Sequence, residues 1–162
     1  MRSKLRTTVG VLTAALSVLV LVVAPVAAEG NTQFSGVGVF DTEGQCLDLP
    51  SEIPPIVMSG DLMGCWYTTS LEVVQTTPSG VYRERGTETF VGCLSDGITC
   101  GTINITYHFE AMFAPDGSEI HGRCQHPFVS GTGDFEGIRG RLNFKDDVET
   151  GEFHYRGHFS LD

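Results

Sequence analysis

A strict alternation of apolar and polar residues is the feature that most limits what this chain can fold into. Residues 101–113 carry an apolar side chain at every second position from Ile103 to Phe113, and residues 152–161 repeat the pattern from Phe153 onward. Successive side chains of a β-strand point to opposite faces. The alternation therefore predicts strands with one buried and one solvated face, as in an antiparallel sheet.

Further strand-like segments follow one another at short, regular intervals. No stretch after residue 28 keeps a helical period of about 3.6 residues for three turns. The predicted strands are 34–40, 62–75, 81–92, 101–113, 119–128, 135–144 and 152–161. Residues 41–60, which contain three prolines, are predicted to form the one long loop. Without a covering helix, the apolar faces must be buried by two packed sheets or by one closed barrel, and closure also removes the sheet edges.

Four glycines lie within ten residues in the stretch SGTGDFEGIRGRLNF, residues 130–144. A dinucleotide-binding loop has the pattern Gly-x-Gly-x-x-Gly between a strand and a helix. Here Gly133 and Gly137 are four residues apart, and a strand-like segment follows. We therefore interpret these glycines as bends in a strand, which a small barrel needs in order to close. The side chains predicted to face inward are Ile138, Leu142 and Phe144.

The same stretch is similar to the GxGxFxGxxG strand of the allene oxide cyclase and dirigent barrels and their bacterial relatives. The segments ITYHFEAMFAPDGSEIHGR and FHYRGHFSL also look like consecutive strands of that barrel. The resemblance covers residues 101–162 and implies an all-β fold, a single small antiparallel eight-stranded calycin-like barrel. Members of this group often form trimers, so the resemblance also implies a homo-oligomer as a candidate state. No catalytic residue is carried over, because residues 29–100 show no match to the family.

Residues 1–28 have the composition of a secretory signal peptide. Three basic residues come first, an apolar run follows over residues 9–23, and small residues precede Glu29. An uncleaved membrane anchor is the alternative, but the apolar run is shorter than the ~20 residues that a span requires. We therefore expect a secreted, extracellular protein whose single domain comprises residues 29–162.

The charge of this domain excludes some classes of partner. Removal of residues 1–28 leaves seven Lys and Arg against 20 Asp and Glu, a formal charge of −13. Nucleic acids are bound through basic patches, so no nucleic-acid partner is expected. An acidic chain is also repelled by anionic membrane surfaces, so no membrane association is expected after signal cleavage.

The five cysteines all follow the signal-like segment, and export to an oxidising compartment favours disulfides. An odd number leaves one thiol unpaired within the chain. In a hairpin turn at 95–98, residue 93 lies opposite residue 100, with Cβ atoms about 4.5–5.5 Å apart. This register predicts a Cys93–Cys100 bridge. Cys124 shares the parity of Ile120 and Phe128 and is predicted to be free and to face inward, which leaves Cys46 and Cys65 for the second bridge. A different register across the 76–80 turn would instead bring Cys65 beside Cys93.

Several polar side chains share the parity of apolar neighbours and are candidates for a pocket inside the barrel. In 81–92, Glu84 and Glu88 share the parity of Tyr82 and Phe90 and so lie on the same face as these aromatic residues. His126 likewise shares the parity of Ile120, Cys124 and Phe128. Burial raises the pKa of a carboxyl group and suits it to proton transfer. The ligand-pocket candidates are Glu84, Glu88, Tyr107, His126 and Tyr155.

The opposite assignment of strand 81–92 is an open alternative. Arg83 and Arg85 alternate with the two glutamates, so a reversed face would bring the arginines inside. A twist of the strand could also move Glu84 and Glu88 to the barrel rim. Either outcome would leave the barrel without the predicted acidic pocket.

Two function classes are consistent with these features. No Gly-x-Ser-x-Gly, His-Glu-x-x-His, paired Cys-x-x-Cys or EF-hand pattern occurs. No cofactor or metal is predicted, and catalytic residues are unknown. The favoured class is a non-catalytic secreted barrel that either binds a small apolar ligand or only presents its surface. The alternative is a cofactor-free isomerase or cyclase of the allene oxide cyclase type, which rests on fold analogy. The free volume inside the barrel distinguishes a filled barrel from one with a ligand site, because such a site needs roughly 300 Å³ or more.

Overall fold

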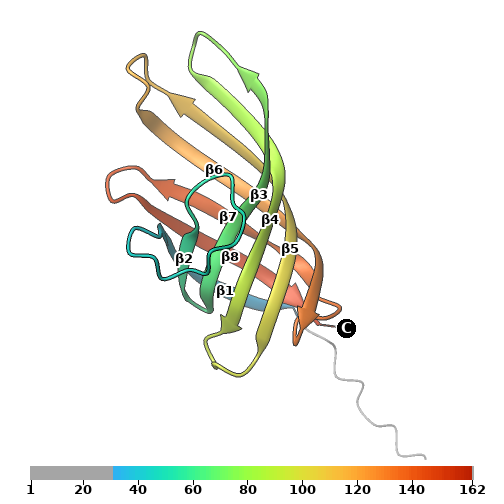
Figure 1. Cartoon of the computed structure of the whole chain (residues 1–162). Helices are drawn as coiled ribbons and strands as arrows, with labels where there is room; N and C mark the ends of the chain where they lie inside the picture. The colour runs from blue at the N-terminus through green and yellow to red at the C-terminus, as the bar shows by residue number, and fades with distance from the viewer. Residues whose placement is uncertain (1–30, 162) are drawn as a thin grey trace, which may run out of the picture.

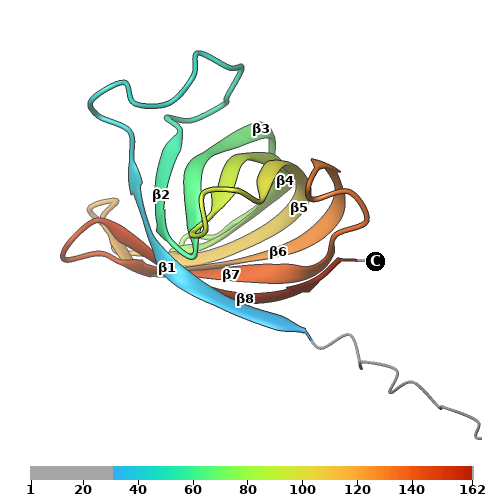
Figure 2. The ribbon, with the colours of Figure 1, turned by 90° about the horizontal axis from the view of Figure 1, so that it is seen from below.

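A computed structural model describes residues 31–161 as eight antiparallel strands closed into one barrel (Figure 1). The strands are β1 (Thr32–Phe40), β2 (Ile56–Gly60), β3 (Leu62–Thr76), β4 (Val81–Leu94), β5 (Cys100–Phe113), β6 (Glu119–Gly133), β7 (Arg139–Asp147) and β8 (Glu152–Ser160). Each strand pairs with the next along the chain, and β1 pairs with β8 to complete the ring (Figure 2). The expected all-β, eight-stranded barrel of calycin-like type is confirmed. The predicted signal peptide lies outside the described residues.

The alternation predicted for β5 and β8 is confirmed by the burial of their side chains. Ile103, Ile105 and Tyr107 are buried inside the barrel, whereas His108 is exposed. Within the described range, no helix has the length and apolar character needed to cross a membrane. The core consists of the inward faces of the strands together with Phe135 and Ile138 of the turn between β6 and β7.

Tyr155 of β8 holds the closure of the barrel from within. Its hydroxyl accepts a hydrogen bond from the Leu62 amide at 2.9 Å and donates one to the Ser59 carbonyl at 2.9 Å. Gly36 lies opposite Tyr155 in the β1–β8 pairing, and a Cβ atom at Gly36 would overlap with the tyrosine ring. Burial raises the pKa of Tyr155 to about 12, so the hydroxyl remains a donor at neutral pH.

Strand β2 corrects the expectation that residues 41–60 form a loop throughout. Its five residues are too few to show a convincing alternation. The segment becomes a strand because β1 and β3 pair with it on both sides, with Met58 opposite Gly38 and Gly64. Only the part up to residue 55 remains a long loop, which projects to one side of the barrel in Figure 2.

Both predicted disulfides and the free thiol are confirmed. Cys46 is bonded to Cys65, Cys93 is bonded to Cys100, and Cys124 is free and buried. The competing register does not occur, because Cys65 lies opposite Val91 rather than Cys93 in the β3–β4 pairing. Two disulfides indicate an oxidising environment of the extracellular type.

The glycine-rich stretch closes one end of the barrel, which corrects the strand predicted over residues 135–144. Gly131 and Gly133 end β6, residues 134–137 form a turn, and β7 begins only at Arg139. Phe135 is fully buried, with its ring centroid 6.3 Å from that of Phe90. A Cβ atom at Gly131 would overlap with the Phe135 carbonyl oxygen. The glycine therefore permits the turn to fold back so that Phe135 fills the barrel end.

A bulge at the start of β6 corrects the inward position predicted for Ile120. Phe113 lies opposite Glu119, whereas Met112 lies opposite His121, so one residue of β6 is unpaired. An extra residue in one strand reverses the parity of the residues on one side of it. Ile120 is accordingly 54% exposed, while Cys124 and His126 farther along β6 face inward as predicted.

Candidate functional site

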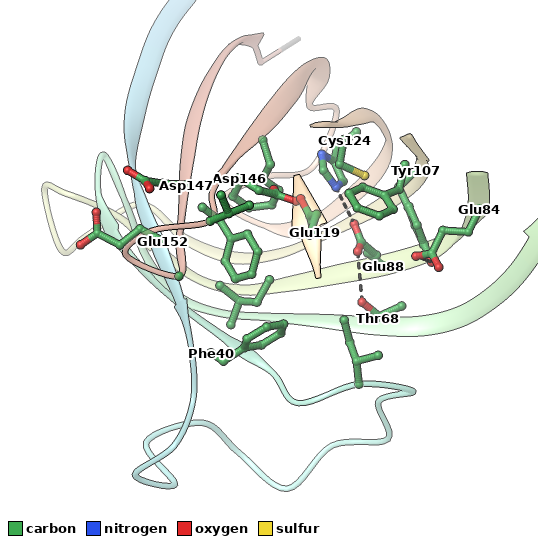
Figure 3. A pocket seen from close by; sticks show the side chains of 18 of the residues that line it. Phe40, Thr68, Glu84, Glu88, Tyr107, Glu119, Cys124, Asp146, Asp147 and Glu152 are labelled. Atoms are coloured by element: carbon green, nitrogen blue, oxygen red, sulfur yellow. Dashed lines mark hydrogen bonds and ion pairs between the residues drawn. The ribbon is translucent and has the colours of Figure 1, made fainter. Parts of the chain in front are cut away.

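A cavity of about 480 Å³ occupies the barrel end opposite the Phe135 turn. Figure 3 shows side chains that line it. Residues from the 41–55 loop, the β5–β6 turn and the β7–β8 turn surround it. Its volume exceeds the roughly 300 Å³ typical of the smallest ligand sites. The large apolar side chains that line it are Phe40, Ile53, Ile56, Phe109, Phe144 and Phe153.

Four of the five predicted pocket residues line this cavity, namely Glu84, Glu88, Tyr107 and His126. Tyr155 is absent from the lining and instead holds the barrel closure. The arginines that could have reversed the face of β4 lie outside, where Arg83 pairs with Glu110 at 3.2 Å and Arg85 with Glu72 at 2.9 Å. The inward assignment of the two glutamates is therefore the one that the barrel adopts.

A buried pair of opposite potential charge lies at the side of the cavity formed by β4 and β6. His126 Nε2 is 3.0 Å from Glu88 Oε2, and Thr68 Oγ1 donates a hydrogen bond of 3.1 Å to Glu88 Oε1. The side chain of His126 is only 1% exposed. Its ring packs edge-to-face against Trp66 and Phe144, at centroid distances of 5.2 and 4.9 Å. These contacts fix the imidazole with Nε2 toward the carboxylate.

The other imidazole nitrogen of His126 has no hydrogen-bond partner in the part of the chain that the structure describes. A neutral imidazole that donates from Nε2 keeps Nδ1 as an acceptor. Buried polar atoms are nearly always hydrogen-bonded to protein, water or ligand. Since His126 lines the cavity, its Nδ1 is suited to contact a bound molecule.

Glu84 forms a second polar cluster with two tyrosines. Its carboxylate accepts hydrogen bonds from Tyr107 at 2.9 Å and from Tyr82 at 2.5 Å. Burial, together with the hydrogen bond to Glu84, raises the pKa of Tyr82 to about 12, and burial and the Glu84 charge also raise the pKa of Tyr107. Both phenols are therefore protonated donors at neutral pH, and Glu84 is an acceptor only.

Asp146 and Glu119 form a carboxyl pair that the sequence analysis did not include. Figure 3 shows the two side chains next to each other in the cavity. Burial, together with the charge of the adjacent Glu119 carboxyl and a hydrogen bond to it, raises the pKa of Asp146 to about 7. A Cβ atom at Gly122 would overlap with Asp146 Oδ2, so the glycine provides the space for this pair.

One of these two residues could have been found from the sequence. Asp146 continues the inward parity of Leu142 and Phe144 by one more step along β7. Glu119 could not have been found in this way, because the bulge at the start of β6 changes the parity there.

The raised pKa of Asp146 predicts a pH-dependent stability. The folded state binds this proton up to about pH 7, whereas the unfolded chain releases it near pH 3.8. Stability from Asp146 is therefore complete below pH 3.8 and is lost as the pH rises to about 7. We expect the free energy of unfolding to fall less between pH 3.8 and about 7 in Asp146→Asn than in the unmodified protein. Urea unfolding at a series of pH values measures this difference.

Asp116→Asn is the matched control for this pH series. Asp116 lies in an exposed turn, where hydrogen bonds from Ser118 lower its pKa. Its ionisation is the same in both states between about pH 5 and 7, so the control should keep the slope of the unmodified protein. If Asp146→Asn also keeps that slope, Asp146 does not hold its proton in the folded state.

Cys124 lines the cavity as a free thiol with low expected reactivity. Burial, followed by the negative charges of Glu88 and Asp146, raises the pKa of the thiol. Since the thiolate is the reactive form, we expect no alkylation of the folded, non-reduced protein by iodoacetamide at neutral pH. After unfolding in urea without reductant, mass spectrometry should find one carboxamidomethyl group, on Cys124. Labelling at any other cysteine would contradict the disulfide pairing.

Taken with the fold, this cavity defines a class of protein: a small disulfide-bonded β-barrel with an acidic, aromatic-walled internal site. Among residues 31–161, no group of three or more His, Cys, Asp or Glu side chains is arranged to hold a metal ion. No protein-family model, curated protein or solved structure matches the chain. The resemblance to the allene oxide cyclase and dirigent barrels therefore stays a prediction, and the geometry of the cavity is the basis for inferring function.

Proposed function

We propose that this protein is secreted and binds a small, largely apolar molecule in the barrel cavity without transforming it. The observation that carries the proposal is the cavity of about 480 Å³, which is walled by aromatic and aliphatic side chains and contains a few fixed polar groups. This composition is typical of small-molecule sites. The signal-like composition of residues 1–28 and the two disulfides support export.

The dimensions of the cavity limit the size and affinity of the ligand. A volume of about 480 Å³ corresponds to roughly 16 water molecules in the liquid, so the ligand has a similar number of non-hydrogen atoms. At roughly 0.3 kcal/mol per non-hydrogen atom, such a molecule gains about 5 kcal/mol on binding. This corresponds to a dissociation constant somewhat below about 1 mM, and better complementarity would make it tighter.

A cofactor-free isomerase or cyclase is the alternative, and one observation favours retaining it. Asp146, with a pKa of about 7, lies in the same cavity as His126 and Glu88. Groups that exchange a proton near neutral pH are those that general acid–base catalysis requires. In the binding proposal, the same groups serve to recognise the polar atoms of the ligand.

The binding proposal is tested on protein purified from the culture medium after expression of the full chain. We expect the measured mass to be that of a mature chain starting at Glu29. Native mass spectrometry should also show any retained ligand and any homo-oligomer. The neutral fluorescent probe N-phenylnaphthylamine should bind saturably at one site per chain. Absence of saturable binding would contradict the proposal.

A pair of variants tests where the probe binds. Cys124→Phe extends a ring into the cavity, whereas Ile98→Phe alters a residue that is 80% exposed in the β4–β5 turn. We expect the first variant to weaken probe binding by about tenfold or more and the second to leave it unchanged. Equal binding by the two variants would place the probe outside the cavity.

The catalytic alternative is tested by returning any recovered ligand to the protein in deuterium oxide. A bound but unchanged molecule supports the proposal. Incorporation of deuterium at carbon, lost in Glu88→Gln, would instead support an isomerase in which the carboxylate moves a proton.

A further inference from the structure

The polar part of the cavity lining carries charge of only one sign. Its ionisable side chains other than His126, Tyr107 and Cys124 are Glu84, Glu88, Glu119, Asp146, Asp147 and Glu152. Among the described residues that line the cavity, none is Lys or Arg. The arginines that flank Glu84 in β4 point outward and are paired there with Glu110 and Glu72. The basic groups beside these carboxylates are the imidazole of His126 at Glu88 and that of His154 at Asp147 and Glu152. Among its described residues, the lining itself has no Lys or Arg to balance Glu84.

Glu84 shows this imbalance most clearly. It is half-buried, and its two carboxylate oxygens accept hydrogen bonds from Tyr82 and Tyr107. These phenols donate hydrogen bonds but contribute no positive charge. A carboxylate removed from water without a counter-charge is costly, and a cation that enters the cavity would offset this cost.

An independent observation at His126 also points to a hydrogen-bond donor on the ligand. The side chain of His126 is 1% exposed and lines the cavity, and its Nδ1 has no partner among the described residues. With Nε2 directed at Glu88, this nitrogen is available as an acceptor. The unpaired nitrogen of His126 is therefore suited to accept a hydrogen bond from the ligand.

We infer that the ligand is an amphipathic amine, whose ammonium group is held by Glu84 and whose apolar part lies against Phe109, Phe144 and Phe153. An ammonium group carries both a positive charge and N–H donors, so it suits the Glu84 carboxylate, which the two tyrosines leave without a counter-charge. A fatty acid of the same length would bring a carboxylate into a negative site. The inference rests on the proposed function, since it names the ligand class of the same cavity.

Three probes with the same decyl chain separate the charge of the head from the apolar part. Decylammonium, decanol and decanoate are titrated at pH 7.5 by displacement of N-phenylnaphthylamine and by calorimetry. We expect decylammonium to bind at least about tenfold more tightly than decanol, and decanoate to bind at least about tenfold more weakly. Decyltrimethylammonium, which has the charge but no N–H donor, should bind more weakly than decylammonium.

A matched pair of carboxylate substitutions tests the contact itself. Glu84→Gln removes one negative charge from the cavity lining. Glu72→Gln removes one negative charge from the exposed ion pair with Arg85. The two variants have the same net charge. We expect Glu84→Gln to weaken decylammonium binding by about tenfold and to leave decanol binding within about twofold. Glu72→Gln should bind all the probes as the unmodified protein does, and retained decanol binding shows that each variant is folded.

The outcomes separate the inference from the proposed function. If decanol binds and decylammonium has no advantage over decanoate, the inference is wrong and the proposed function stands. If Glu72→Gln loses the decylammonium advantage as Glu84→Gln does, the advantage comes from the overall charge, and the inference is also wrong. If none of the probes binds saturably, the proposed function itself is contradicted.

Discussion

Replacement of Phe135 by alanine is expected to lower the free energy of unfolding by about 3–5 kcal/mol, as for other buried aromatic truncations. The ring is fully buried at the closed end of the barrel. Backbone hydrogen bonds from Asp134 to the Cys100 carbonyl and from Ile138 to the Phe135 carbonyl hold the turn in place. Because the turn cannot collapse into the space that the ring leaves, most of the cost of the vacated volume should be retained. Urea or guanidinium unfolding at equilibrium measures this loss.

Two further variants show whether the loss belongs to the buried ring. Ile98→Ala removes an apolar side chain that is 80% exposed in the β4–β5 turn at the same end of the barrel. Its effect should stay within about 0.5 kcal/mol. The loss of stability in Phe135→Leu should lie between those of Phe135→Ala and Ile98→Ala, because leucine retains part of the buried volume. Similar losses for Phe135→Ala and Ile98→Ala would mean that Phe135 does not close the barrel.

Replacement of His126 by leucine is expected to cost about 3–5 kcal/mol, because Glu88 then has no partner of opposite potential charge. Glu88 is 7% exposed, and apart from the contact with His126 its carboxylate has only the hydrogen bond from Thr68 among the described residues. Leucine fills much of the imidazole volume, so the loss reports the stranded carboxylate more than a change in packing. Equilibrium unfolding at neutral pH measures it.

The double variant His126→Leu/Glu88→Met is the control for that interpretation. It removes both polar partners, and replacement of a whole buried pair by apolar side chains is often close to neutral. We expect it to be more stable than His126→Leu alone, with a coupling free energy of about 1–3 kcal/mol in a double-mutant cycle. Simple addition of the two single effects would show that the pair does not act as a unit.

Local sequence patterns were enough to predict an all-β fold, and four of the five residues that they proposed for a pocket line the cavity. The alternation in 101–113 and 152–161 identified the buried faces, because a period of two has the same meaning wherever a strand lies. The tight turn at 95–98 identified the Cys93–Cys100 bridge, because it determines which residues oppose each other. Parity within β4 and β6 placed Glu84, Glu88 and His126 inside the barrel.

The errors occurred where a local pattern is broken or too short. The five residues of β2 carry little periodic signal and become a strand through pairing with both neighbours. Ile120 was assigned to the wrong face because a single unpaired residue in β6 reverses the parity around it. Tyr155 does point inward, but the distance along the barrel between it and the cavity cannot be read from parity.

The sequence by itself determined that this protein is all-β, which faces of its strands are buried, and that Cys93 lies opposite Cys100, because strand period and turn register act between near neighbours. Only the tertiary structure decided that Phe135 closes one end, that Asp146 meets Glu119, and that the other end holds a cavity of about 480 Å³. These features depend on side chains from strands far apart in the chain and on how far each one extends into the barrel. Such distances follow from the shape of the closed sheet, which no local pattern contains.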